Sequence, residues 1–169
     1  KIKYFMDPEV TVFRKASAAI PVSFGYMTWY LRLWLPPFGN RFKLVKPLDD
    51  HMYFVQVTAK RLARELFHKM VLHQQKLAQK QNILNRFVDI GADLFAVSCV
   101  CSYADSLHKK GEVKDALKLA DLFCRQTRRR ISSRFKDVSH NDDRSSYSVA
   151  KKLLNGDYEW LEDDIIKGR

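Results

Sequence analysis

The sequence contains few cysteines, which can cross-link a chain, and few prolines and glycines, which can interrupt helices and strands. Its 169 residues include only three Cys, five Pro and six Gly. These counts exclude collagen-like and proline-rich classes, and three Cys without repeated spacing argue against a secreted disulfide framework and favour a reducing compartment. The period-two alternation of β-strands and the GxSxG, P-loop and GxGxxG motifs are also missing. With 46% hydrophobic and 29% charged residues, the composition is typical of one globular domain.

Acidic residues are scarce as well. Thirty Lys and Arg stand against 19 Asp and Glu, a net charge of +11 that favours an anionic partner such as nucleic acid, phospholipid or the phosphates of CoA. Arg125–Lys136 holds six bases and no acid, whereas Asp157–Asp164 holds five acids and no base, so the two blocks can pair with each other. The chain begins with Lys1 and shows no signal or transit pattern, which indicates a processed or partial chain.

Apolar residues recur at helical spacing along most of the chain, with cations outside the apolar face. Asp7-Pro8-Glu9 is a good helix start, and Lys109-Lys110-Gly111 is a good helix end. The pattern predicts an all-α fold, an antiparallel helical bundle preceded by an aromatic, apolar interfacial segment. The predicted helices cover residues 7–20, 49–78, 80–108, 112–135 and 141–154. The predicted regions are an N-terminal one (1–48), a three-helix core (49–138) and a fourth helix with an acidic tail (139–169).

The segment from Val22 to Leu35 carries five aromatic rings and a single charge. It is shorter than the roughly 20 apolar residues that span a bilayer, and it is apolar on every side, unlike an ordinary surface helix. Trp and Tyr settle at membrane–water interfaces, where neighbouring cations meet lipid phosphates. We therefore predict contact with a membrane or a partner; the alternative is burial in the core. The predicted contact residues are Tyr26, Trp29, Tyr30, Arg32, Trp34, Phe38, Arg41 and Lys43.

No catalytic or metal site is predicted. Cys99 and Cys101 are two residues apart on a helix and cannot share one ion, and the cysteines lie in apolar surroundings that favour core packing over activated thiolates. Asp89 and Asp93, one turn apart, are more typical of acids that meet neighbouring Arg, either Arg86 or the cluster from 125 to 130, than of a catalytic dyad.

The basic run supports two interpretations. Its arginines can bind phosphates or an acidic partner, or they can form a solvated face neutralised inside the protein, with Ile131 and Phe135 continuing the core stripe. Nucleic acid is not favoured because aromatic residues are not interleaved with the arginines. The candidates for phosphate or acidic-partner binding are Arg125, Arg128, Arg129, Arg130 and Arg134.

The stretch Gln81–Asp105 resembles a helix in the extra C-terminal domain of very-long-chain acyl-CoA dehydrogenases and their complex I assembly paralogue. The matching residues, at similar spacing, are Leu84, Arg86, Asp89, Gly91, Asp93, Leu94, Ala96, Val100, Ser102 and Ala104. Leu119–Ile131 is similar to the Cys-containing helix that follows there, and Asn155–Glu162 looks like the close of long bacterial-type members. Pro37-Phe38-Gly39-Asn40 is similar to a linker motif that precedes the domain. The resemblance covers residues 36–162 and is strongest over 81–131.

The resemblance implies an α-bundle that packs on a flavin-binding body and helps to hold a peripheral protein at a membrane. In that family the body binds FAD, carries the catalytic Glu and converts fatty acyl-CoA to trans-2-enoyl-CoA in β-oxidation. Neither the FAD site nor that Glu has a counterpart here, so we expect no cofactor, catalytic or metal residue in this chain. The implied location is the matrix side of the mitochondrial inner membrane, or the cytoplasmic face of a bacterial membrane. The implied partners are the dehydrogenase body or a homodimer mate, and an anionic membrane surface. The alternative is a non-catalytic structural subunit of a respiratory-type membrane complex.

Overall fold

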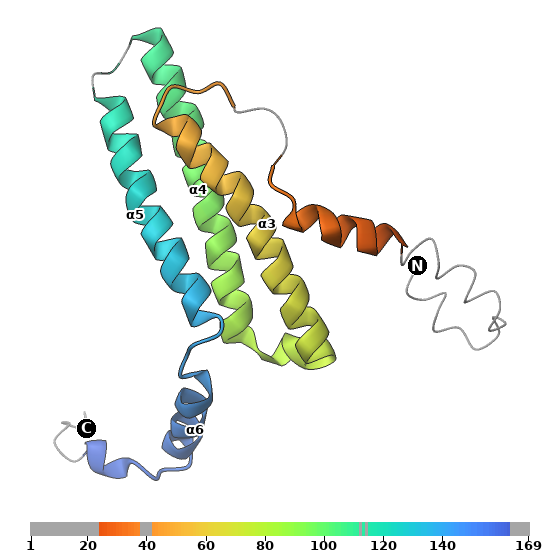
Figure 1. Cartoon of the computed structure of the whole chain (residues 1–169). Helices are drawn as coiled ribbons and strands as arrows, with labels where there is room; N and C mark the ends of the chain where they lie inside the picture. Colours follow the sequence, from red (N-terminus) through yellow and green to blue (C-terminus); the bar gives the residue numbers. More distant parts are fainter. Residues whose placement is uncertain (1–23, 38–41, 112, 114, 163–169) are drawn as a thin grey trace, which may run out of the picture.

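The computed structural model describes residues 24–37, 42–111, 113 and 115–162, and within these residues it contains helices and no strand. Three long helices, α3 (Leu48–His73), α4 (Gln81–Lys110) and α5 (Ala116–Asp137), run antiparallel to their chain neighbours and pack side by side (Figure 1). The predicted all-α bundle is confirmed. The predicted helix over residues 7–20 lies outside the described residues.

Helix α3 ends earlier than predicted. The expected helix over residues 49–78 is interrupted at Gln74, whose φ of 48° takes the chain out of the right-handed helical region. The chain continues as a 3-10 helix, η1 (Gln74–Gln79), which turns the corner into α4. Periodicity missed this break because Leu77, the one buried residue of η1, still fits an apolar helical stripe.

Helix α4 has the best-predicted boundary. It ends with His108, Lys109 and Lys110 in its last turn, and Gly111 follows with a left-handed φ of 69°. Glycine adopts this conformation without steric cost, and the cations lie at the negative end of the helix dipole. Helix α5 then begins at Ala116 rather than at Glu112, because Asp115 also has a left-handed φ, of 65°.

The core lies between the three helices in two clusters. One gathers around Val97 and Cys101 of α4, against the start of α3 and Cys124 of α5. The other joins Ile90 and Leu94 of α4 to Ile131 and Phe135 of α5. The apolar stripes that spacing predicted on α4 and α5 are therefore the faces that these helices bury.

Two smaller elements follow the bundle among the described residues. Helix α6 (Asp143–Leu154) and the 3-10 helix η2 (Glu159–Glu162) lie past the end of the bundle where α5 stops (Figure 1). Helix α6 contains no buried residue and is joined to α4 by a bidentate pair between Arg86 and Asp143, both bonds 2.6 Å long. The predicted regions meet after residues 48 and 138, close to the start of α3 and the end of α5. The division of the chain into these regions stays a prediction.

Candidate functional site

The aromatic helix, residues 24–34, packs one of its sides on α3 (Figure 1). Trp29 meets Phe67 edge to face with ring centroids 5.7 Å apart, and the Tyr30 hydroxyl lies 2.8 Å from Nε2 of His68. Arg64 stacks on the Trp34 ring at 4.4 Å. These contacts use the hydroxyl group of Tyr30 and the rings of Trp29 and Trp34, so part of the predicted interfacial set attaches this helix to the bundle.

Two cations of α3 also hold the end of the aromatic helix. Arg64 donates a hydrogen bond to the Leu33 carbonyl at 2.7 Å, and Lys60 donates one to the Leu35 carbonyl at 2.9 Å. The last carbonyls of a helix have no partner within the helix and carry its negative dipole end. The cations of α3 thus satisfy carbonyl groups at the C-terminal end of the aromatic helix.

The opposite side of the aromatic helix is apolar and exposed. Phe24, Met27 and Leu31 have exposed fractions of 62%, 54% and 56%. Phe24 and Leu31, seven residues apart, share one face of the helix, and Met27 lies between that face and the side that contacts α3. Sequence reasoning concentrated on Trp and Tyr and passed over this face, although its spacing was a readable signal.

The predicted contact residues occupy different positions around this helix. Tyr26, Trp29 and Trp34 keep large exposed areas, whereas Tyr30 is half-buried. Arg32 and Lys43 are exposed. Phe38 and Arg41 lie outside the described residues. The membrane or partner role of this set stays a prediction.

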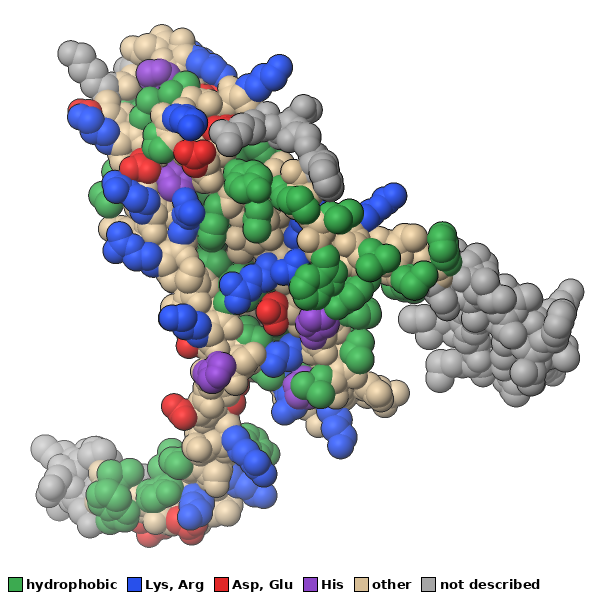
Figure 2. Space-filling view, in the orientation of Figure 1, with side chains coloured by type: hydrophobic (Ala, Val, Ile, Leu, Met, Phe, Trp, Pro, Cys, Tyr) green, Lys and Arg blue, Asp and Glu red, His purple; other side chains and the backbone are tan. Residues whose placement is uncertain are grey.

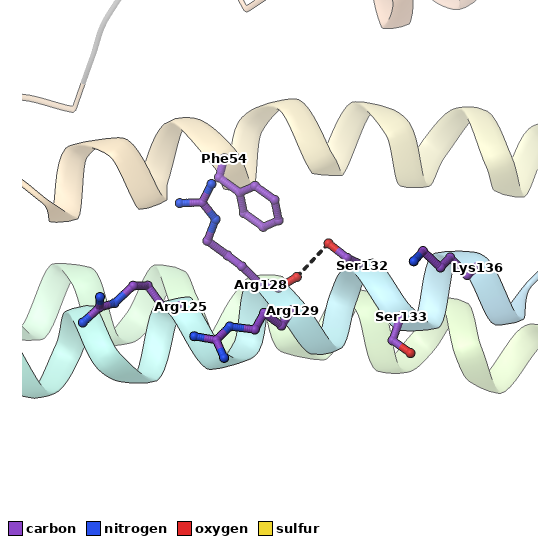
Figure 3. A pocket seen from close by; sticks show the side chains of 7 residues that line it. All are labelled: Phe54, Arg125, Arg128, Arg129, Ser132, Ser133 and Lys136. Carbon is purple, nitrogen blue, oxygen red and sulfur yellow. Dashed lines mark hydrogen bonds between the residues drawn. The ribbon is translucent and has the colours of Figure 1, made fainter.

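A basic groove follows the outer face of α5. It is an open depression of about 460 Å³, lined mainly by cations and hydroxyl groups (Figure 3). Phe54 of α3 forms its apolar side, and the guanidinium of Arg128 covers that ring at 4.4 Å. The lining residues from α5 are Arg125, Arg128, Arg129, Ser132, Ser133 and Lys136.

Two of the five phosphate candidates are instead paired with acids of α4. Arg130 makes two hydrogen bonds to the Asp93 carboxylate, of 2.9 and 2.6 Å, and Arg134 binds the same carboxylate and reaches Asp89 at 3.4 Å. The bond to Asp93 raises the pKa of Arg130. The acids of α4 therefore neutralise part of the basic run. The sequence suggested that the basic run and the acidic tail can pair with each other. Among the described residues, however, no ion pair joins the two.

A buried histidine connects α3 to the basic groove. His51 lies 2.9 Å from the Asp121 carboxylate through Nε2 and 3.2 Å from the Arg128 guanidinium through Nδ1. A guanidinium only donates, so Nδ1 accepts from Arg128 and the Nε2–H group donates to Asp121. Asp121 also pairs with Arg125 at 2.9 Å. No sequence signal links these residues, because His51 and Asp121 are seventy positions apart.

The outer side of α4 is uncharged. Val88, Phe95 and Tyr103 are largely exposed there, with Ala92 and Cys99 exposed between them. By length and composition α4 is also the one described helix that could cross a membrane, a test that the central helix of a packed bundle passes as well. Its two other sides contact α3 and α5, so this strip is the part of α4 open to a further partner.

The described residues hold no group of three His, Cys, Asp or Glu side chains placed to bind a metal ion. The Sγ atoms of Cys101 and Cys124 lie 3.6 Å apart between α4 and α5, and both residues are fully buried. The hydrogen bond to Cys124 and burial raise the pKa of the Cys101 thiol, which disfavours its reactive thiolate form.

The described residues do not fit FAD either. A flavin needs a deep site that encloses a planar ring system and offers it hydrogen bonds. Two depressions among the described residues, a basic one on α5 and an apolar one at the corner of α3, η1 and α4, are both open. No chemical step of this chain is therefore assigned to a flavin.

The described residues form an antiparallel bundle of three long helices with exposed apolar and basic surfaces. Comparison with known proteins identifies the family. Residues 46–156 match the family described as ACAD9/ACADV, C-terminal domain. The chain belongs to this family of acyl-CoA dehydrogenase C-terminal domains, and the resemblance seen in the sequence is confirmed.

Curated relatives agree with this assignment. The chain is 34% identical over 167 residues to proteins named probable acyl-CoA dehydrogenase FadE10 from Mycobacterium tuberculosis and Mycobacterium bovis. The match covers 95% of this chain and 25% of each relative, so the chain spans about a quarter of their length. No solved structure matches the chain significantly.

Proposed function

We propose that this chain is the membrane-association and assembly domain of a very-long-chain-type acyl-CoA dehydrogenase. The family membership and the printed names of the relatives support the acyl-CoA dehydrogenase context. In this proposal the chemistry, oxidation of fatty acyl-CoA to the 2-enoyl-CoA with FAD taking the hydride, belongs to a flavin-binding body outside the described residues. The proposed location is peripheral, on the matrix side of the mitochondrial inner membrane or the cytoplasmic face of a bacterial membrane.

The observation that carries the proposal is the two-sided aromatic helix. Its inner side is held on α3 by Trp29, Tyr30 and Trp34, so the apolar side with Met27 and Leu31 is presented to solvent in a fixed position. An exposed apolar helix face next to cations inserts into the boundary between headgroups and acyl chains. Because α3 supplies the attachment, the helix does not have to order itself at the membrane.

The test replaces the exposed side only. Met27→Gln with Leu31→Gln should lower partitioning into phosphatidylcholine–phosphatidylglycerol vesicles at least about tenfold, because two side chains lose their apolar burial. Trp29 and Trp34 are left intact, since removing them would also detach the helix from α3. The matched control, Leu153→Gln with Leu154→Gln on α6, should bind as the wild type does. Equal co-sedimentation of all three proteins would refute the membrane proposal.

The uncharged strip on α4 favours a second contact. Val88, Phe95 and Tyr103 form an apolar surface of the kind that marks protein–protein interfaces. We propose that it covers part of the flavin-binding body in an intact dehydrogenase, or a subunit of a membrane complex if this protein is a non-catalytic structural subunit.

The intact mass of the natural polypeptide, with its flavin absorbance, separates these two partners. A mass several times 19.8 kDa with bound flavin is the expected result for a working dehydrogenase. A mass near 19.8 kDa without flavin would contradict that expectation and leave the structural subunit.

A further inference from the structure

The basic groove contains a row of three exposed cations, of which one is paired with an acid of the bundle. Arg129 and Lys136 are exposed, and within the described part of the chain no ion pair holds either of them. Arg125 pairs with Asp121, yet its side chain remains 57% exposed. These three residues lie along one face of α5 over eleven positions, which corresponds to about 16 Å at the rise of an α-helix.

Arg129 and Lys136 differ from most other cations of α5 because they lie outside the ion pairs that the structure shows among the described residues. Arg130 and Arg134 point toward α4 and share the Asp93 carboxylate. Arg128 lies flat on Phe54 and contacts His51. The row therefore retains its capacity to bind anions while the bundle keeps its own neutralised pairs, and Ser133 adds a hydroxyl group between the cations (Figure 3).

One view of the molecule shows both α5 and the aromatic helix. Figure 1 shows α5, α4, α3 and the aromatic helix in that order across the molecule. In this view Lys and Arg side chains gather over α5, and hydrophobic side chains gather over the aromatic helix (Figure 2).

We propose that Arg125, Arg129 and Lys136 bind the phosphates of an anionic lipid surface. This inference rests on the proposed membrane association and adds a second, electrostatic contact to it. The groove is open, so it would bury little of a small phosphate ligand, whereas a membrane offers several phosphates along 16 Å, about the length of the row. Single-stranded nucleic acid fits less well, because the groove's single aromatic ring, Phe54, is already covered by Arg128 and cannot stack on a base.

The test compares two variants of the 169-residue chain that lose the same charge. The row variant is Arg125→Gln, Arg129→Gln, Lys136→Gln, and the control is Arg144→Gln, Lys151→Gln, Lys152→Gln, three exposed cations of α6. At about one kcal/mol per cation near an anionic surface, the row variant should bind phosphatidylcholine–phosphatidylglycerol vesicles about 10- to 100-fold more weakly at low salt. The control should change less than about threefold because it keeps the row. Circular dichroism and thermal unfolding verify that both variants fold.

Salt and lipid composition identify the contact as electrostatic. High salt should remove the difference between the row variant and the wild type, and vesicles of phosphatidylcholine alone should not distinguish them. The proposal is overturned if row variant and control bind mixed vesicles equally. It is also overturned if the row variant keeps its vesicle binding but loses binding to duplex DNA, which would make the row a nucleic-acid site.

The same vesicles separate this inference from the aromatic helix. Weak binding by the row variant together with wild-type binding by the Met27 and Leu31 variant would support the row and refute the apolar contact. The reverse pattern would support the apolar contact and overturn the row.

Discussion

The three-helix bundle and helix α6 differ in what holds them, although both carry apolar residues at helical spacing. In the bundle, Ile90, Val97 and Ile131 are removed from water. In α6, Tyr147 and Leu154 are exposed, and the bidentate pair with Arg86 is the main attachment to α4. The comparison teaches that an apolar stripe yields stability only where a second element covers it, because the hydrophobic contribution follows the area removed from water.

The largest expected effect is a cavity in the core. Ile131 has an exposed fraction of 1% and packs against Ile90 and Leu94, so Ile131→Ala should lower the free energy of unfolding by about 2–5 kcal/mol. Leu154→Ala, at a position 87% exposed, should change it by less than about 0.5 kcal/mol. Urea unfolding followed by circular dichroism measures both. Similar losses of unfolding free energy in the two variants would mean that another surface covers α6 in solution.

The next effect compares the two carboxylates that bind arginine. Asp93→Asn should lower the free energy of unfolding by about 1–3 kcal/mol, because Arg130 and Arg134 lose the mostly buried carboxylate that they share. The exposure of the Arg130 side chain to water reduces this loss. Asp143→Asn breaks the link to Arg86 at the end of the bundle and should leave global unfolding nearly unchanged. Hydrogen exchange should instead become faster in α6 alone. Loss of global stability in Asp143→Asn would show that α6 belongs to the cooperative core.

The smallest expected effect is pH-dependent release of α6. The hydrogen bonds from Arg86 lower the pKa of Asp143 below its ordinary value. The stabilisation from this carboxylate is therefore fully present above its unfolded pKa and is lost as pH falls through the lower, folded value. We expect amide exchange in α6, corrected for intrinsic rates, to accelerate in that acidic range before the bundle unfolds. In Asp143→Asn this acceleration of amide exchange at acidic pH should be missing. If the variant shows the same pH dependence as the wild type, the acceleration comes from other titrating groups.

The sequence predicted those features that depend on neighbouring residues. The apolar spacing on α4 and α5 identified the buried faces, and Gly111 marked the end of α4 because a left-handed residue was required there. The family was also readable, from ordered matches within α4 and α5. The break at Gln74 was not predicted, since a change of backbone angle at one polar residue leaves the apolar pattern intact.

The candidate surfaces were only partly predictable. The aromatic segment and the basic run were visible as composition, but composition does not say which side of a helix is covered. Trp29 and Tyr30 contact α3, and Arg130 and Arg134 meet Asp93, through packing between segments distant in sequence. The exposed face with Met27 and Leu31, and the row with Arg129 and Lys136, remain after those contacts are made.

The sequence by itself thus determined the helices, their buried stripes, the excess of positive charge and the family, because each is a local or additive property of the residues. Only the tertiary structure decided which cations and which aromatic side chains stay available to a partner. The physical reason is that a side chain can bind a partner only if contacts within the fold have not already used it. Those contacts join residues such as His51 and Asp121, which are distant in the sequence and share no local pattern.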